Sequence, residues 1–203
     1  MKKLIAVTMI LLLFAAGCQK KDSVSEPVVP EATAESATAA ETAAEESAAE
    51  PEPSAYAFTF SAQTLDGETV TEAFFGQYDL TMVNVWASWC PPCRGELDEL
   101  TALYGRLPVN VGFLSVTVDD PADLTAAADL LKEHGCAFSC LDGQASEGLM
   151  KGFLNTVQAI PTTLFLDATG KEVGNRIVGV PQGAKTVSDA YLSAIEDRLS
   201  MIG

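Results

Sequence analysis

The sequence predicts an α/β fold in which a central mixed sheet is flanked by helices. Residues 80–86 are rich in β-branched and aromatic side chains, which is typical of a strand buried on both faces. Directly behind this strand, leucines at 97, 100, 103 and 107 recur at three- and four-residue steps, as on one face of a helix. Strand-like and helix-like segments then alternate to the end of the chain, and this alternation indicates an α/β architecture.

Two short strands are expected before the central one. Residues 56–60 alternate as in a strand, and Leu65-Asp66-Gly67-Glu68 is typical of a turn into a second one. After the central strand and helix, further strands are expected at 110–118, 137–141, 162–166 and 173–178, and helices at about 124–131, 146–154 and 183–201.

The N-terminal segment is predicted to be a targeting sequence. Lys2 and Lys3 precede an apolar run at 4–16 that is too short to span a bilayer comfortably. The run ends in Ala15-Ala16-Gly17-Cys18, which resembles a bacterial lipoprotein cleavage site with Cys18 as the lipidated residue. An ordinary signal peptide or an uncleaved anchor is the alternative.

The rest of the chain is expected to divide into a tether and one domain. Residues 19–55 are dominated by Ala, Glu, Ser, Thr and Pro and lack an apolar face, so we interpret them as a disordered acidic tether. Residues 56–203 suffice for one domain with a sizeable core. The net charge of the chain, −16, makes nucleic acid a poor partner.

The chemistry is expected at Cys90-Pro91-Pro92-Cys93, where the strand meets the helix. The thiolate is the reactive form of cysteine, and a helix N-terminus stabilises it. Cys90 can therefore attack a disulfide as the nucleophile, and Cys93 can resolve the mixed disulfide. A zinc half-site or two packed core cysteines are the alternatives, but zinc would need more ligands than the single histidine, His134, and one further cysteine pair readily supply.

These residues carry a resemblance to a known family. The run from Asn84 to Cys93, followed by Arg94, Glu96 and Leu97, and the distant Ile160-Pro161-Thr162-Thr163 resemble the membrane-anchored thioredoxins of the TlpA/ResA type. The resemblance implies a thioredoxin fold with an N-terminal β-hairpin extension. It also implies thiol–disulfide exchange by the Cys90–Cys93 disulfide, with no other cofactor and no metal.

The same resemblance assigns further site residues. Glu96 would assist proton transfer and tune the thiol pKa values, although an exposed carboxylate near a helix N-terminus is the alternative. Asn84 stands where ordinary thioredoxins carry a buried Asp. A cis peptide bond is implied before Pro161. The residues expected to contact substrate are Trp89, Pro91, Pro92, Ile160, Pro161 and Thr162.

A second cysteine pair, Cys136 and Cys140, is not required by the family. Residues four apart on a straight strand are about 13 Å apart, whereas a disulfide needs Cα atoms within about 7 Å. An accessory disulfide therefore requires a bend at 137–139. A disulfide, two free thiols and a second redox pair all remain open, and a soft-metal site with His134 is the weaker reading.

The predicted function is that of an extracytoplasmic, lipid-anchored, monomeric reductase of protein disulfides. The resemblance implies a CcdA-like membrane thiol transporter as electron donor, and apocytochrome c, a surface methionine sulfoxide reductase or misoxidised secreted proteins as clients. A disulfide-forming oxidant is the main alternative. A copper chaperone or sensor is disfavoured, because those relatives use CxxxC and a later histidine, and a peroxidase is disfavoured because its cysteine does not need this motif.

Overall fold

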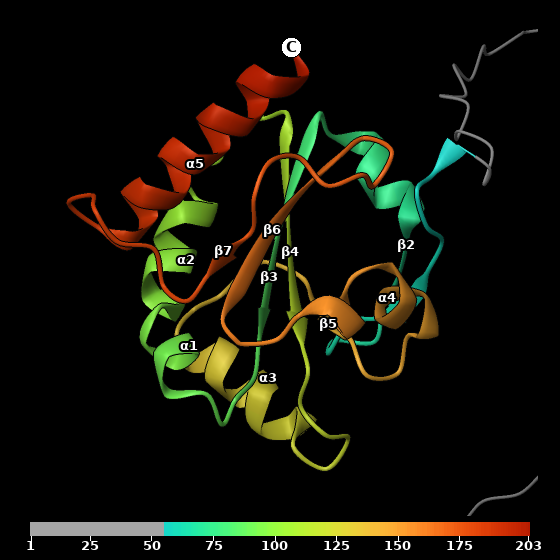
Figure 1. Cartoon of the computed structure of the whole chain (residues 1–203). Coiled ribbons are helices and arrows are strands. Elements are labelled where there is room, and N and C mark those ends of the chain that lie inside the picture. The colour runs from blue at the N-terminus through green and yellow to red at the C-terminus, as the bar shows by residue number, and fades with distance from the viewer. Residues whose placement is uncertain (1–54) are drawn as a thin grey trace, which may run out of the picture. The chain divides into compact units, whose positions relative to one another are not determined.

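The computed structural model describes residues 55–203 (Figure 1). The predicted signal peptide, its Cys18 and nearly all of the predicted tether lie outside the described residues. None of the helices within 55–203 has the length and apolar character needed to cross a membrane.

A five-stranded mixed sheet forms the centre of the described domain. Its strands follow the order β5 (Cys140–Asp142), β4 (Val111–Thr117), β3 (Leu80–Trp86), β6 (Thr162–Asp167) and β7 (Ile177–Val178). β3 is parallel to β4 and antiparallel to β6, and every residue of β3 is buried. The continuous apolar run that predicted a doubly covered strand is therefore explained by its central place in the sheet.

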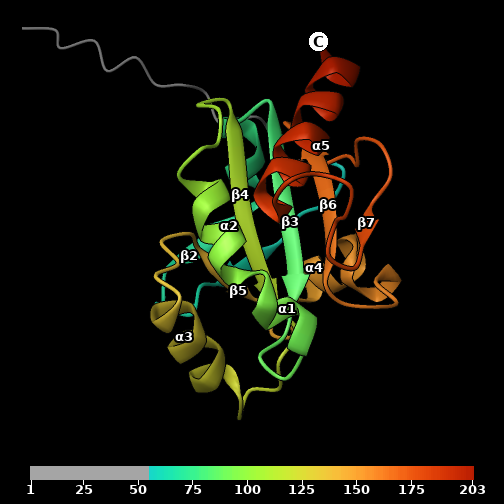
Figure 2. The same cartoon turned by 90° about the vertical axis from the view of Figure 1, so that its left-hand side faces the viewer.

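Helices and a hairpin cover the two faces of this sheet. One face carries α1 (Pro91–Gly95), α2 (Leu97–Tyr104), α3 (Leu124–Glu133) and α5 (Val187–Ile202). The other carries α4 (Glu147–Gly152), the 3-10 helices at 72–77 and 154–156, and the antiparallel hairpin of β1 (Ser61–Gln63) and β2 (Thr69–Thr71). Figure 2 shows α2 and α5 side by side, with α1 at the end of β3. The predicted α/β class and the hairpin extension are confirmed.

The helix behind the cysteines differs from its prediction because it is broken at Glu96. The N–H of Glu96 donates to the Cys93 carbonyl at 3.3 Å, a three-residue bond that tightens the chain between α1 and α2. Leu97, Leu100 and Leu103 form the buried stripe as expected, whereas Leu107 lies beyond the helix end. The break turns the Glu96 side chain into the protein.

Element boundaries also differ from those expected. The first hairpin strand lies at 61–63 and not at 56–60, because the rings of Phe58 and Phe60 pack against each other and against Phe75. The last helix begins at Val187 and not near Gly183, because the Thr186 hydroxyl caps it by accepting from the Asp189 N–H at 3.0 Å. β5 begins at Cys140, and β7 is only two residues long.

Candidate active site

Cys90 and Cys93 form a disulfide where β3 passes into α1. The S–S distance is 2.02 Å and the Cα atoms are 5.3 Å apart. Cys90 is the N-cap of α1, and Cys93 is fully buried in its first turn. The sequence prediction that the motif lies at a strand-to-helix joint is therefore confirmed.

The two prolines determine which backbone group meets the sulfur of Cys90. Pro91 and Pro92 have no N–H, so the first N–H of α1 that is available belongs to Cys93. It lies 3.3 Å from Cys90 Sγ and points at it. An N–H aimed at this sulfur from a helix start favours a negative charge on Cys90 once the disulfide is opened.

The loop before β6 faces the disulfide. The peptide bond between Ile160 and Pro161 is cis, as the resemblance implied, and the Ile160 carbonyl oxygen lies 3.8 Å from Cys90 Sγ. Thr162 is buried, and its hydroxyl donates to the Ala159 carbonyl at 2.7 Å. Thr162 thus braces the loop, and the Ile160 backbone is the part of it that lies beside the sulfur.

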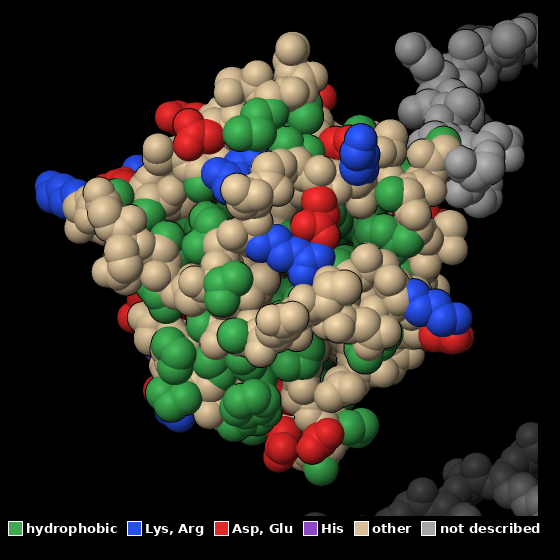
Figure 3. Space-filling model, in the orientation of Figure 1, with side chains coloured by type: hydrophobic (Ala, Val, Ile, Leu, Met, Phe, Trp, Pro, Cys, Tyr) green, Lys and Arg blue, Asp and Glu red, His purple; other side chains and the backbone are tan. Residues whose placement is uncertain are grey.

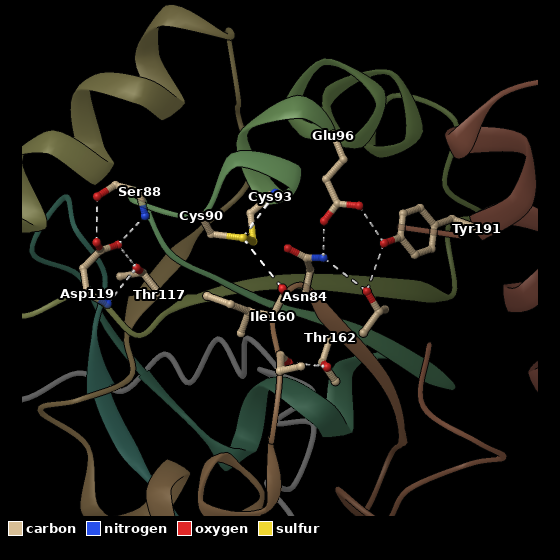
Figure 4. Close-up of a disulfide and its surroundings, with 12 residues drawn as sticks. Asn84, Ser88, Cys90, Cys93, Glu96, Thr117, Asp119, Ile160, Thr162 and Tyr191 are labelled. Atoms are coloured by element: carbon tan, nitrogen blue, oxygen red, sulfur yellow. Dashed lines mark hydrogen bonds between the residues drawn. A yellow bond between two sulfur atoms is a disulfide. The ribbon is translucent and has the colours of Figure 1, made fainter. Parts of the chain in front are cut away.

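Glu96 lies to one side of the disulfide, beyond Asn84 (Figure 4), and is only 1% exposed. Its Oε1 accepts from Asn84 Nδ2 at 3.1 Å, and its Oε2 accepts from the Tyr191 hydroxyl at 3.0 Å. Burial raises the pKa of Glu96 to about 7, against the opposing effect of these two hydrogen bonds. The carboxyl therefore changes its charge near neutral pH, and the exposed-carboxylate alternative is wrong.

Asn84 joins this carboxyl to the sheet. Its Nδ2 also donates to Thr163 Oγ1 on β6 at 3.1 Å, while its Oδ1 is buried and has no hydrogen-bond partner among the described residues. Figure 4 shows the amide nitrogen toward Glu96 and the oxygen on the side of the disulfide. Asn84 thus lies between Glu96 and the cysteines.

An apolar groove adjoins the disulfide on the other side of the Ile160 loop. Trp89 forms one wall and is 61% exposed, and the cavity measures about 460 Å³. The other lining residues are Val118, Gln144, Met150, Leu154, Val157, Gln158, Ala159 and Ile160. No charged side chain is among them. Figure 3 shows hydrophobic side chains gathered on the lower part of its face, toward the end where β3 and β4 finish. The walls from α4 and its following turn were not anticipated, because sequence spacing does not bring them near Trp89.

A buried carboxylate holds the segment that leads into Cys90. Asp119, just after β4, is fully buried and accepts from the Ser88 N–H at 2.8 Å and the Ser88 hydroxyl at 2.6 Å. The Thr117 hydroxyl also donates to it. Asp119 directly follows the strand expected at 110–118, and it ties Ser88, two residues before Cys90, to the end of β4 (Figure 4).

The second cysteine pair is not bonded in this structure, so the accessory disulfide is not formed here. Cys136 is half-buried, with its sulfur 3.2 Å from the Thr101 hydroxyl, and Cys140 is buried. Burial raises the pKa of both thiols, that of Cys140 to about 11. His134 Nδ1 lies 2.7 Å from Asp98 Oδ1. Within 55–203 there is no group of three or more side chains suited to hold a metal ion.

Taken together, this geometry defines a class of protein. A Cys-x-x-Cys disulfide at a helix start, opposite a cis-proline on a mixed sheet, is the arrangement of thioredoxin-fold thiol–disulfide oxidoreductases. Residues 53–173 match the AhpC/TSA family, and the chain belongs to that family.

Similar proteins agree with this class. The chain is 39% identical over 140 residues to a thiol:disulfide interchange protein DsbE homolog of Paracoccus denitrificans, covering 68% of this chain and 72% of that protein. It is 29% identical over 114 residues to the sporulation thiol-disulfide oxidoreductase A of Bacillus subtilis, covering 55% and 66%. The chain is thus a thioredoxin-like thiol–disulfide oxidoreductase, as predicted.

Solved structures confirm the fold. A thiol:disulfide interchange protein of the thioredoxin family from Chlorobium tepidum superposes with a TM-score of 0.57 at 25% identity, covering 71% of this chain and 95% of that one. StoA from Bacillus subtilis superposes with a TM-score of 0.52 at 26% identity, covering 66% and 96%. The thioredoxin fold expected from the sequence is therefore confirmed.

Proposed function

We propose that the chain is an extracytoplasmic, membrane-tethered reductase of protein disulfides. In the reduced protein, the Cys90 thiolate attacks one sulfur of a client disulfide, forms a mixed disulfide and releases the other client sulfur as a thiolate. Cys93, deprotonated, then attacks Cys90 Sγ, which restores the Cys90–Cys93 disulfide and releases the second client sulfur. The client gains the two electrons that the dithiol loses.

The observation that carries this proposal is the environment of the two sulfurs. Cys90 Sγ receives the Cys93 N–H and lies beside the Ile160 carbonyl, whereas Cys93 is fully buried. A sulfur that is stabilised by an N–H and slightly exposed, as Cys90 is at 3%, suits the nucleophile, and the fully buried Cys93 suits the resolving cysteine. These are different environments for two residues of one short motif, and they support different roles.

Glu96 is proposed as the group that takes the proton of Cys93 during resolution. A buried thiol must lose its proton before it can attack, and a base works best when its pKa lies near the working pH. Glu96 meets this condition with a pKa of about 7. It begins the helix that follows Cys93, and Figure 4 places it on the Cys93 side of the disulfide.

We place the client segment across the Ile160 loop and in the groove beside Trp89. Extended backbone would run along Ile160 and Pro161, while Pro91 and Pro92 are exposed next to Cys90 and offer apolar contact. The groove has no charged wall, so an uncharged or apolar side chain next to the client cysteine fits it best.

The proposed setting completes this function. Lipidation of Cys18 would hold the protein at the membrane surface, and residues 19–55 would give it reach as a monomer. Disulfides persist outside the cytoplasm. A reductase there needs imported electrons, for which a CcdA-like membrane thiol transporter is the proposed donor. Two relatives are named for thiol–disulfide chemistry, which fits protein disulfides as the substrate.

Trapping tests the proposal. The full-length Cys93→Ser variant should accumulate mixed disulfides through Cys90 with an oxidised model protein, because the resolving thiol is gone. The matched Cys90→Ser variant should accumulate none. Equal trapping by both variants would contradict the assignment of roles, and trapping by neither would contradict the disulfide-exchange mechanism.

A further inference from the structure

A closed ring of hydrogen bonds lies beside the disulfide, and its last member comes from the C-terminal helix. Asn84 Nδ2 donates to Thr163 Oγ1, and Thr163 Oγ1 lies 3.2 Å from the Tyr191 hydroxyl oxygen, to which it donates. The Tyr191 hydroxyl donates to Glu96, and Asn84 closes the ring by donating to the other oxygen of the same carboxyl. Four side chains from β3, β6, α5 and the α1–α2 junction are thus connected (Figure 4).

The direction of the donors favours a negative charge on Glu96. Both of its oxygens accept, and the Tyr191 hydroxyl hydrogen is used on one of them. If protonated Glu96 donated to Tyr191, the hydroxyl hydrogens of Tyr191 and Thr163 would have to reverse. Thr163 would then accept from both Asn84 and Tyr191, and its own hydroxyl hydrogen would have no acceptor within the ring. The ring therefore fits the ionised carboxyl better than the neutral one.

Burial and the hydrogen-bond ring have opposite effects on the pKa of Glu96. Glu96 is almost wholly shielded from water, which raises its pKa, while Asn84 and Tyr191 lower it. The groups that face Glu96 are Asn84 from β3 and Tyr191 from α5, with the Cys93 end of α1 next to it in the chain. Burial and the charge of Glu96 raise the pKa of the Tyr191 hydroxyl, so this hydroxyl keeps its proton and stays a donor at neutral pH.

We propose that Tyr191 is a positioning residue that keeps Glu96 ionised and able to take the proton of Cys93. Through this contact α5 sets the pH range in which the disulfide exchanges. The inference rests on the proposed role of Glu96. It adds that the charge of Glu96 is controlled by a residue 95 positions further along the chain. Tyr191 is suited to this because it is fully buried and α5 packs against both α2 and β3.

The direct test is an NMR titration of the Glu96 carboxyl carbon in the full-length oxidised protein. Tyr191→Phe removes one hydrogen bond to a charged group and keeps the aromatic side chain. Glu96 should therefore bind its proton at least about tenfold more tightly. Tyr104→Phe makes the same chemical change on the exposed side of α2 and should leave the titration unchanged. An unchanged titration in Tyr191→Phe, or an equal change in Tyr104→Phe, would overturn the proposal.

Thr163→Val is the second variant, because it alters the hydrogen-bond ring without substituting a residue of α5. It removes the hydroxyl that donates to Tyr191 and should tighten proton binding by Glu96 in the same direction, by less than Tyr191→Phe does. The opposite direction would contradict the ring as described. Thermal unfolding of each variant reports whether it is folded at the temperature of the titration.

Reaction rates measured as a function of pH distinguish the role of Tyr191 from the proposed role of Glu96. The pH profile of disulfide reduction should move to higher pH in Tyr191→Phe, and the same substitution in a Glu96→Gln background should not move it. A shifted Glu96 titration with an unshifted profile would overturn the action of Tyr191 on the reaction, together with the proposed role of Glu96. An unshifted titration overturns the part played by Tyr191 alone.

Discussion

The two cysteine pairs of the described domain differ in nearly everything except residue type. Cys90 and Cys93 are disulfide-bonded at a helix start, beside a cis-proline loop and a buried carboxyl. Cys136 and Cys140 are free thiols whose pKa values are raised by burial. Cys140 begins β5, the edge strand next to β4, and the Cys136 sulfur contacts the Thr101 hydroxyl.

The contrast shows that cysteine chemistry follows from the groups around the sulfur. An N–H aimed at Cys90 Sγ lowers the cost of a thiolate there, whereas loss of water around Cys140 raises it. Spacing alone does not separate the pairs, because CxxC and CxxxC both bring sulfurs near each other in suitable turns. Variants of the groups around the sulfurs, as well as of the sulfurs themselves, therefore test this contrast.

The largest difference between the pairs should appear on removal of a sulfur. Cys90→Ser should abolish reduction of a model disulfide, since no other cysteine within residues 55–203 has its surroundings. Cys140→Ala should leave turnover within about twofold and cost roughly 1 kcal/mol of stability through a small cavity. Turnover assays with dithiothreitol as reductant, together with urea unfolding, make the comparison. Comparable losses of activity in the two variants would contradict it.

Removing the charge of Glu96 should slow disulfide exchange by Cys90 and Cys93 without abolishing it. We expect Glu96→Gln to slow disulfide exchange by about 100-fold, the lower range for loss of a general base. The loss should be greatest above pH 7, where Glu96 is ionised in the native protein. Stopped-flow rates over a range of pH measure this, and a profile parallel to that of the unaltered protein would exclude Glu96 as the base.

The same carboxyl should also make the free energy of unfolding depend on pH. Its pKa is about 7 in the folded protein, against an ordinary pKa of 4.5 for a glutamic acid side chain, so the folded state holds the proton more tightly. The corresponding stability is fully present below pH 4.5 and is lost as pH rises through 7, by about 3 kcal/mol. Urea unfolding at several pH values should show this slope in the unaltered protein and not in Glu96→Gln.

Asp119 should matter for the first pair although it does not touch it. Asp119→Ala leaves the Ser88 N–H and hydroxyl without their acceptor, which should cost about 2 kcal/mol and loosen the approach to Cys90. Asp119→Asn keeps an acceptor oxygen and should recover part of this loss. Unfolding free energies of the two variants test the prediction, which fails if both lose the same amount.

The last prediction concerns alkylation of the second pair and involves no change in activity. In the native oxidised protein at pH 8, Cys140 should react with iodoacetamide at least about 100-fold more slowly than in urea, because it is buried and its thiolate is rare. Cys136, which is half-buried, should react faster than Cys140. Mass spectrometry of timed samples gives both rates, and a faster Cys140 would reverse the proposed order.

The sequence was informative wherever the signal was local. The continuous apolar run of β3 and the leucine stripe of α2 predicted their elements, and the motif at their joint predicted the disulfide region. The cis bond before Pro161 and the position of Glu96 required the family resemblance, because neither follows from residue type alone. The strand expected at 56–60 failed, because aromatic packing between Phe58 and Phe75 overrode the alternation that suggested it.

Other parts of the site could not be predicted because they depend on tertiary structure. Tyr191 lies within the helix expected at about 183–201, and only the packing of that helix against α2 and β3 brings its hydroxyl to Glu96. Asp119 follows the strand expected at 110–118, and only the register of β3 with β4 brings it beside Ser88. The groove walls on α4 likewise require the fold.

The reduction potential of the Cys90–Cys93 pair tests the proposed direction of the reaction most directly. It is measured by equilibrating the full-length protein with dithiothreitol or glutathione mixtures, with a Cys136→Ser/Cys140→Ser variant as the control for coupling between the pairs. A reductase predicts a value near that of thioredoxin, about −270 mV, with the same value in the control. A value near −120 mV, typical of a strong oxidant, would contradict the reductase and make the protein a disulfide-forming enzyme.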